Sequence, residues 1–297
     1  MKTLLAAAAS LALGGCLINQ DAPSDLDRAI PTSDQVSIKL PSAEARTIGD
    51  LATYYVATRD VTRTFNGSTG WVLVLLHTIV SYPVTTHTGD TYEWGPWSDA
   101  LDPSEYKLDV VDNHDGTYSY DLAGRDKTTA GSQFEDVITG VASTSGQGSF
   151  TLDFDAGRRV NPIDSGDATG SVDVSYDLAA KTLDLGISTT NAAGAPVEAD
   201  YQYAEDSTGG GDMTFDVDQD QGGGPALEHS TLRSRWESTG AGRSDARVEG
   251  GDLGATQITA SECWDTLFRR TFYTDSASFA PTEGAESDCA FTSSDLP

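Results

Sequence analysis

Three aspartates stand two residues apart, at Asp216, Asp218 and Asp220. Calcium-binding loops use this spacing to direct several carboxylate oxygens at one hard cation. The segment departs from the EF-hand pattern, because Gln221 occupies the place of the turn glycine and Leu227 that of the bidentate acid. A strand whose alternate aspartates face water explains the same spacing. The sequence therefore leaves two interpretations open, a solvated strand and a Ca²⁺ site.

A second group of residues that could bind a ligand is aromatic. Trp94 and Trp97 belong to the segment that begins at Tyr92, and Trp71 opens a long apolar run. Such side chains can stack on sugar rings or line an apolar cavity, but they also fill the cores of β-rich proteins. The three tryptophans are candidates for the wall of a ligand cavity, with a packed core as the alternative.

Familiar catalytic motifs are missing from the sequence. The chain has no Gly-x-Ser-x-Gly elbow and no His-Glu-x-x-His pair, and its run from Gly240 to Asp245 lacks the third glycine of a phosphate-binding loop. Its four histidines include no pair at metal-ligand spacing on one helix face. Two-carboxylate catalysis stays open, although 46 acidic residues make any chosen pair uninformative. The sequence favours a protein without catalytic activity over an unrecognised hydrolase.

The first fifteen residues have the plan of a secretory signal peptide. Lys2 supplies a positive charge, an apolar stretch runs from Leu4 to Leu13, and small residues directly precede Cys16. The apolar stretch of about ten residues is half of the roughly twenty that a membrane-crossing helix needs. Residues 1–15 are therefore predicted to be cleaved off rather than to span a membrane.

The residues Leu13-Gly14-Gly15-Cys16 resemble the lipobox of bacterial lipoproteins. The resemblance implies cleavage before Cys16, a diacylglycerol on its thiol and an acyl chain on its new amino group, which together make a stable membrane anchor. An ordinary signal peptide followed by a chance cysteine is the alternative. Leu17 stands where an aspartate would retain such a lipoprotein in the inner membrane, so the resemblance implies the outer membrane of the cell envelope.

The composition indicates a folded and strongly acidic protein. The 297 residues carry 46 acidic and 18 basic side chains, a formal net charge of −28. Such a surface repels nucleic acid and anionic lipid headgroups, which argues against both as partners. The 11 tyrosines, 9 phenylalanines and 5 tryptophans exceed what disordered chains carry.

The two remaining cysteines, Cys263 and Cys289, are predicted to form a disulfide. Their compartment permits disulfides, and they lack the close spacing and neighbouring histidines of the alternative, a metal or redox pair. The bridge would close a loop of about 26 residues and contribute roughly 3 kcal/mol in the chain-entropy model.

Two segments precede the β-rich part of the chain. Residues 16–41 are polar and contain prolines, which is typical of a flexible tether behind the lipid. Residues 42–89 carry apolar positions at steps of three and four from Leu51 to Phe65, then the helix stop signal Asn66-Gly67, then the apolar run from Trp71 to Tyr82. The length of that run favours a helix over a strand. We expect a helical hairpin that covers or plugs a sheet.

Residues 90–297 change to a period of two, with turn signals at regular intervals. Apolar residues alternate on both sides of Asp115-Gly116, a dipeptide typical of tight hairpins. The pattern predicts a mainly β domain, an antiparallel meander of roughly 10–12 strands. Long bare edges invite aggregation, so we expect the sheet to form a barrel or an open half-barrel.

These features support two views of function. In the first, the envelope lipoprotein binds a small hydrophobic or amphiphilic ligand between its curved sheet and apolar helices. In the second, it is a structural or adhesive surface protein with a packed core. The run from Ser261 to Asp265 and the later Cys289 resemble uncharacterised envelope lipoproteins of myxobacteria, which supports the location and the disulfide and leaves function and oligomeric state open.

Overall fold

The computed structural model describes residues 22–23, 25–32, 35, 51–163, 168–191, 194–220 and 224–296 of the chain, without the side chains of residues 27, 64–71, 73 and 74. The predicted signal peptide, the lipidation site Cys16 and most of the predicted tether lie outside these residues. The side chain of Trp71, one candidate for the wall of a ligand cavity, lies outside them as well.

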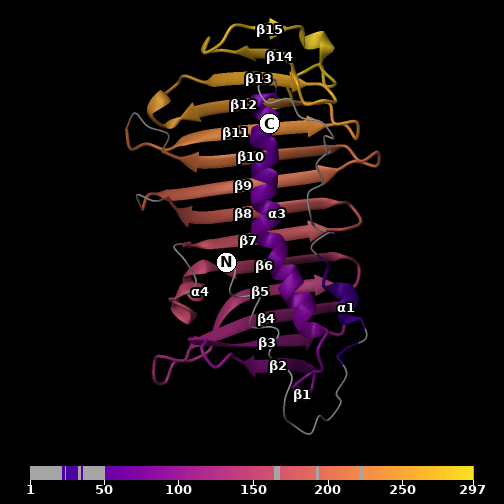
Figure 1. Ribbon diagram of the computed structural model, residues 1–297, viewed down its shortest axis with the longest axis vertical. Coiled ribbons are helices and arrows are strands. Elements are labelled where there is room, and N and C mark those ends of the chain that lie inside the picture. Colours follow the sequence, from indigo (N-terminus) through magenta and orange to yellow (C-terminus); the bar gives the residue numbers. More distant parts are fainter. Residues whose placement is uncertain are drawn as a thin grey trace. The chain divides into compact units, whose positions relative to one another are not determined.

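The described chain is mainly β, as the sequence predicts. Fifteen strands form one antiparallel meander in chain order, so each strand pairs with its neighbours in sequence (Figure 1). They are β1 (Thr86–Thr88), β2 (Thr91–Trp97), β3 (Ser104–Asp112), β4 (Thr117–Asp126), β5 (Glu135–Ser143), β6 (Gln147–Asp153), β7 (Ser171–Asp177), β8 (Thr182–Thr190), β9 (Pro196–Glu205), β10 (Gly211–Gln219), β11 (Glu228–Trp236), β12 (Gly242–Gly250), β13 (Ile258–Trp264), β14 (Arg270–Asp275) and β15 (Glu283–Gly284). The meander therefore has more strands than the roughly 10–12 predicted from the alternation.

The sheet does not close into a barrel, so of the two expected forms the closed one is wrong. Strands β1 and β15 stand at the two ends of the strand order, and they are three and two residues long. Very short edge strands offer few unpaired backbone groups to another chain, which is one way in which open sheets avoid aggregation. Closure is not needed to protect such edges.

The described residues contain few helical elements: α1 (Leu26–Ala29), α3 (Thr53–Val80), α4 (Phe154–Val160) and the 3₁₀ turns η2 (Gly251–Leu253) and η3 (Glu286–Asp288). The short α1 falls within the predicted tether, and Leu26 and Ile30 there are buried. Part of that segment is therefore packed against the folded body. Among the described residues, no helix is both long and apolar enough to cross a membrane.

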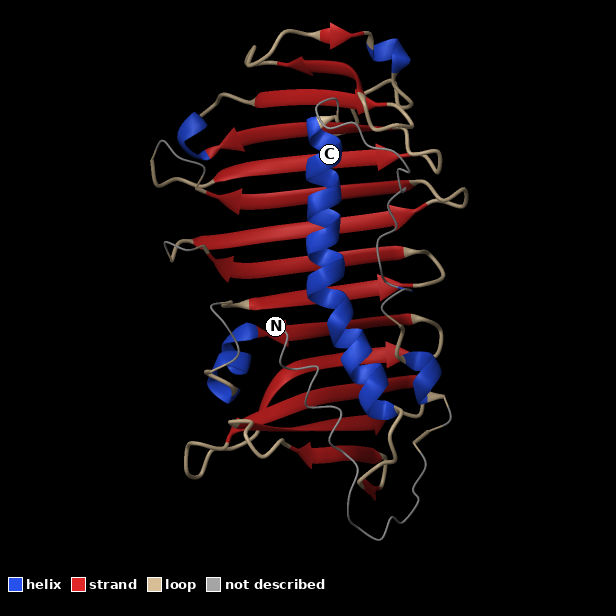
Figure 2. Cartoon of the chain, viewed as in Figure 1, coloured by secondary structure: helices blue, strands red, loops and turns tan. Residues whose placement is uncertain are grey.

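The predicted helical hairpin of residues 42–89 is wrong, because α3 is one continuous helix (Figure 2). Its interior contains Asn66 and Gly67, the predicted stop signal. Glycine in a helix interior costs about 1 kcal/mol relative to alanine. Burial of Tyr55 before the glycine and of Leu76 and Ile79 after it offsets this cost. Packing of the helix thus overrides the local stop signal.

The chain forms two compact units. Unit 1 comprises Met1–Val36 and Thr69–Ala179, and it holds α1, the second part of α3, β1–β7 and α4. Unit 2 comprises Ser37–Ser68 and Ala180–Pro297, and it holds the first part of α3 and β8–β15. Each unit contains part of the apolar face of the meander.

The hairpin predicted around Asp115-Gly116 is confirmed in unit 1. Strands β3 and β4 pair from Ser104 opposite Asp126 to Asp112 opposite Tyr118, and the turn lies between them. The alternating apolar residues are all buried: Tyr106, Leu108 and Val110 in β3, and Tyr118, Tyr120 and Leu122 in β4. Period-two alternation correctly identifies the face that forms the core.

Aromatic rings in both units lie over glycines of a neighbouring strand. Tyr120 in β4 stands opposite Gly140 in β5, where an added β-carbon would lie 2.5 Å from the ring carbon Cζ. The arrangement recurs in four further cross-strand pairs: Tyr106 with Gly124 and Tyr176 with Gly148 in unit 1, and Trp236 with Gly211 and Trp264 with Gly242 in unit 2. Because glycine leaves the space above the backbone empty, each ring can lean across the adjacent strand.

Glu262 of β13 holds the start of α3 in unit 2. Its buried carboxylate accepts hydrogen bonds from the backbone amides of Thr53, at 3.0 Å, and Tyr54. It also accepts one from Nε of Arg270, at 2.5 Å. The carboxylate therefore satisfies two amides that the first helical turn leaves unpaired, and its charge complements the helix dipole.

Candidate functional site

The polar face of unit 2 is the face of its sheet that points away from α3. Thr58 of α3 contacts the hydroxyl groups of Ser234 in β11, at 2.6 Å, and Ser244 in β12, at 3.3 Å. Thr62 contacts Met213 in β10. Side chains alternate along a strand, so the residues next to these in sequence project from the opposite face. We call this opposite face of β8–β12 the polar face.

A groove of about 650 Å³ lies on the polar face and is open to solvent. It is lined by Thr182 and Asp184 of β8, Gln202, Tyr203 and Ala204 of β9, Asp212, Thr214 and Asp216 of β10, and Arg233 of β11. The register places Gln202 directly opposite both Asp184 and Thr214. Hydroxyl, amide, carboxylate and guanidinium groups thus stand together, and they offer both donors and acceptors of hydrogen bonds.

Arg233 is the cation of the groove, and its charge is balanced. Its Nε and Nη2 donate to the two carboxylate oxygens of Asp212, at 3.1 and 2.6 Å. Its Nη1 lies 3.0 Å from Oδ2 of Asp295. The hydrogen bond with Asp212 is the main cause that raises the pKa of the Arg233 guanidinium. The groove therefore presents no uncompensated positive charge at this position.

His229 connects two of the predicted candidate residues at the rim of the groove. Its Nδ1 lies 2.8 Å from Oδ1 of Asp218, and its Nε2 lies 3.4 Å from Oδ1 of Asp216. The Thr231 hydroxyl donates to the same Asp216 oxygen at 2.6 Å and lies 3.4 Å from His229 Nε2. Cross-strand register produces this cluster, because Asp216 stands opposite Thr231 and Asp218 opposite His229.

The order Asp218, His229, Thr231 resembles the orienting acid, base and hydroxyl of a nucleophilic triad, but its geometry favours a structural role. A nucleophile must give its proton to the base, whereas Thr231 gives its proton to Asp216. Thr231 is also only 2% exposed, which keeps its oxygen from a substrate carbonyl. The cluster orders the polar face without activating the hydroxyl.

The structure supports the strand interpretation of the three aspartates. Asp216 and Asp218 lie in β10 and project from its polar face, and Asp220 follows the end of the strand. Residues two apart on an extended strand are about 7 Å apart, so their carboxylates do not converge as they do in a calcium loop. In the part of the chain that the structure describes, no group of three or more His, Cys, Asp or Glu side chains is arranged to hold a metal ion.

The two described candidate tryptophans belong to β2 of unit 1. Trp94 is 3% exposed, and its indole Nε1 donates to the carbonyl oxygen of Tyr82 at 2.8 Å. Trp97 is partly exposed and stands opposite Tyr106, after a bulge in the strand. Trp94 therefore packs in the core and has its polar atom satisfied within the protein.

A smaller groove of about 410 Å³ lies in unit 1, between β4, β5 and α4. The guanidinium of Arg125 stacks 4.7 Å from the centre of the Phe134 ring and pairs with Glu105 at 2.5 Å. Arg159, on the other side, pairs with Glu135 at 2.6 Å. The groove of unit 2 is larger and is lined by strand residues alone, so we regard it as the stronger candidate.

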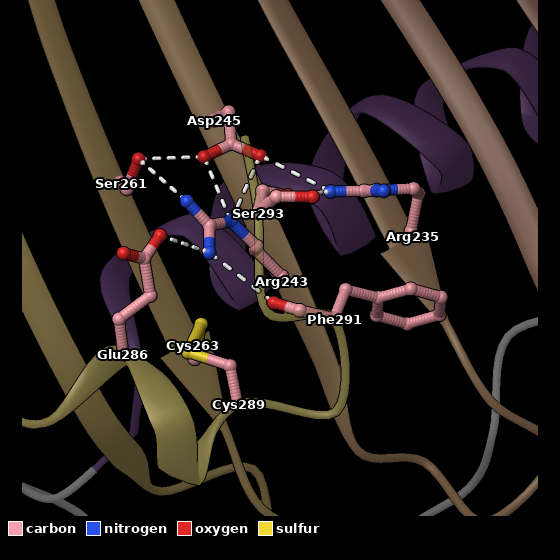
Figure 3. The surroundings of a disulfide bond; sticks show 9 residues. All are labelled: Arg235, Arg243, Asp245, Ser261, Cys263, Glu286, Cys289, Phe291 and Ser293. Atoms are coloured by element: carbon pink, nitrogen blue, oxygen red, sulfur yellow. Dashed lines mark hydrogen bonds and ion pairs between the residues drawn. A yellow bond between two sulfur atoms is a disulfide. The ribbon is translucent and has the colours of Figure 1, made fainter. Parts of the chain in front are cut away.

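Sequence reasoning overlooked a row of arginines next to the groove, formed by Arg233 and Arg235 of β11 and Arg243 of β12. Arg243 is 1% exposed, and its Nε bonds both oxygens of Asp245 at 2.9 and 3.0 Å (Figure 3). The Arg-x-Arg spacing at 233–235 in a chain with 18 basic residues was the available signal. The row cannot be recognised without the register of β11 and β12, which pairs Arg235 with Arg243.

The predicted disulfide between Cys263 and Cys289 is confirmed beside this row (Figure 3). It joins β13 to the segment that follows η3, and both cysteines are buried together with Phe272.

Comparison of the chain with protein-family models, with curated proteins and with solved structures gives no match.

Proposed function

We propose that this protein is a membrane-anchored lipoprotein of the cell envelope that has no catalytic activity and adheres to a neutral, hydroxyl-rich polymer through the groove of unit 2. The observation that carries the proposal is the groove of about 650 Å³, built from polar side chains on strands β8–β11. Strands hold such side chains at fixed spacings, which suits a binding surface better than a mobile loop does.

The packing of the apolar face supports adhesion over transport of a hydrophobic ligand. Trp94 is buried with its indole nitrogen bonded, and the cross-strand rings lie over glycines that leave them room. In unit 2 the ring of Tyr55 in α3 stacks 4.2 Å from that of Phe268, in the turn between β13 and β14. Interiors packed in this way leave few voids for a lipid chain.

The chemistry of the groove supports a hydroxyl-rich ligand. Sugar hydroxyls both donate and accept hydrogen bonds, and Gln202, Thr214 and Asp184 offer both kinds of partner side by side. The formal net charge of −28 disfavours anionic polymers. An open groove accommodates the middle of a chain, so a polymer end is not required.

The lipobox Leu13-Gly14-Gly15-Cys16 supports the anchor. Three acyl chains on one cysteine bind a membrane stably, whereas a single chain binds marginally. Replacing Cys16 by serine is therefore expected to move the protein from the membrane fraction to the soluble fraction.

A binding assay with the full-length lipoprotein in detergent tests the proposal. Neutral envelope and matrix polysaccharides on an array are expected to retain the wild type, and the double variant Asp184→Asn, Gln202→Ala should bind at least tenfold more weakly. Asp136→Asn, a change of one exposed carboxyl in unit 1, is the matched control and should bind like the wild type. Equal binding by the groove variant, or native mass spectra with a stoichiometric lipid beyond the anchor, would overturn the adhesion proposal.

A further inference from the structure

The chain after Cys289 lies over the polar face of β11 and β12. Figure 3 shows Phe291 and Ser293 of this segment beside Arg235 and Arg243. The segment, residues 290–296, belongs to no helix or strand and is mostly exposed, with only Phe291 and Leu296 partly buried. We call it the tail. It is therefore held by polar contacts more than by a core of its own.

Each arginine of the row donates to one carbonyl of the tail, and the three carbonyls are two residues apart. Nη1 of Arg243 donates to the Phe291 carbonyl at 3.2 Å, and Nη2 of Arg235 donates to that of Ser293 at 2.6 Å. Nη1 of Arg233 donates to the carbonyl of Asp295. An array of donors that engages every second carbonyl recognises the backbone of a chain irrespective of its side chains.

Two side chains of the tail add specificity to this backbone recognition. The guanidinium of Arg235 lies 5.0 Å from the centre of the Phe291 ring. The carboxylate of Asp295 lies 3.0 Å from Nη1 of Arg233 and 3.7 Å from Nη1 of Arg235. The arginine row thus selects an aromatic residue and, four positions later, a carboxylate.

The arginine row is held in place more firmly than the tail that covers it. Arg243 and Asp245 are each 1% exposed as side chains and bond to each other beneath the tail. Asp245 also accepts a hydrogen bond from the Ser261 hydroxyl at 2.6 Å. Arg243 donates to the carboxylate of Glu286, which precedes the disulfide-bonded Cys289 in the chain. The exposed ion pairs of Asp295 contribute little by comparison. The tail can therefore leave while the disulfide, Glu286 and Asp245 keep the row in place.

We propose that the arginine row is a second binding site, for a partner segment that carries an aromatic residue followed four positions later by a carboxylate, and that the tail occupies this site as an internal competitor. The partner is an acidic peptide, recognised through alternate backbone carbonyls and these two side chains. The site borders the polysaccharide groove and shares Arg233 with it, but it rests on contacts of Arg235 and Arg243, which do not line the groove.

A labelled peptide with the tail sequence, Ala-Phe-Thr-Ser-Ser-Asp-Leu, tests the proposal by fluorescence anisotropy against full-length protein. In the full-length double variant Phe291→Ala, Asp295→Asn the tail loses both specific contacts, and hydrogen exchange of residues 290–296 should rise. We expect this variant to bind the peptide at least tenfold more tightly than the wild type does. A peptide with asparagine in place of its aspartate should bind at least fivefold more weakly.

Arg235→Gln in the same double-variant background should abolish binding of the peptide. The matched control is Arg125→Gln, which removes another arginine stacked on an aromatic ring and should leave binding unchanged. The proposal is overturned by a released tail without peptide binding, by unchanged exchange of the tail, or by binding that does not depend on Arg235. Dimers formed by exchange of tails would make a second copy the partner and would overturn it as well.

Discussion

Asp121 illustrates how a single, partly buried carboxyl in unit 1 couples stability to pH. It stands in β4 opposite Asp109 of β3. Burial of the group, and then the nearby charges of Asp136 and Asp109, raise its pKa to about 6, against the opposing effect of Lys107. An unfolded aspartate has a pKa of about 3.9. Between these values the folded protein binds more protons than the unfolded chain, so its stability falls as the pH rises from about 4 to 6.

Asp121→Asn should therefore stabilise the protein at neutral pH. The side chain is partly solvated, which reduces the expected gain to about 1 kcal/mol at pH 7. At pH 4 the folded aspartate is protonated and the unfolded one is about half protonated, so most of the gain should be lost. Urea unfolding midpoints at the two pH values measure the difference.

Asp115→Asn is a control for which the change in stability at neutral pH should have the opposite sign. Hydrogen bonds from the hydroxyl and the backbone amide of Thr117 lower the pKa of Asp115. A lowered pKa gives stability that is present at neutral pH and is lost as the pH falls through the folded value. This variant should therefore be less stable than the wild type at pH 7. A constant gain for Asp121→Asn from pH 4 to pH 7 would contradict the electrostatic explanation.

At the scale of elements, the glycines beneath aromatic rings leave the space that each ring needs to pack against the neighbouring strand. Gly140→Ala would place a β-carbon 2.5 Å from Cζ of Tyr120 and 2.6 Å from the Ser149 carbonyl oxygen. The ring must then swing out of its position, and overpacking of this kind costs about 1–3 kcal/mol. Chemical denaturation should show that loss.

Gly186→Ala is the matched control, because Gly186 also lies within a strand and the nearest described atom that its added β-carbon would meet is a carboxylate oxygen of Asp200, at 3.8 Å. Its effect should stay within about 0.5 kcal/mol, as for other substitutions away from packed contacts. Similar losses for both variants would show that strand propensity, rather than the ring over Gly140, explains the cost.

The elements also show what the sequence can and cannot predict. Alternation identifies β3 and β4 because only one of their faces is apolar, and the Asp115-Gly116 turn fixes their pairing. Strand β12 cannot be identified from alternation. Its residues Gly242 to Asp245 are all buried, because α3 lies against one face and the tail region against the other. Burial on both faces removes the period of two.

The candidate sites were predictable only in part for a related reason. The aspartates Asp216 and Asp218 are recognisable from their spacing, but their partner His229 lies on the next strand. The arginine row likewise requires the pairing of β11 with β12 and the return of the tail. Contacts between strands depend on register, which a single sequence specifies only where a short turn fixes it.

For the whole molecule, the disulfide should stabilise unit 2 selectively. It links positions 26 residues apart, both within Ala180–Pro297, and a loop of that length contributes about 3 kcal/mol in the chain-entropy model. The double variant Cys263→Ser, Cys289→Ser should therefore lose that amount in the unfolding of unit 2. Hydrogen exchange followed by mass spectrometry separates the units, because β13 and β14 report on unit 2 and β3 and β4 on unit 1.

The outcome shows whether the two units of the meander unfold separately or together. Each strand pairs with its neighbours in sequence. The loss of the disulfide should therefore increase hydrogen exchange in β13 and β14 first and leave β3 and β4 protected. Reduction of the wild type under native conditions should reproduce this pattern if the bridge, rather than the serines, is responsible. Equal loss of protection in β3 and β4 would mean that the two units unfold as one cooperative body, with the continuous helix α3 as the element that they share.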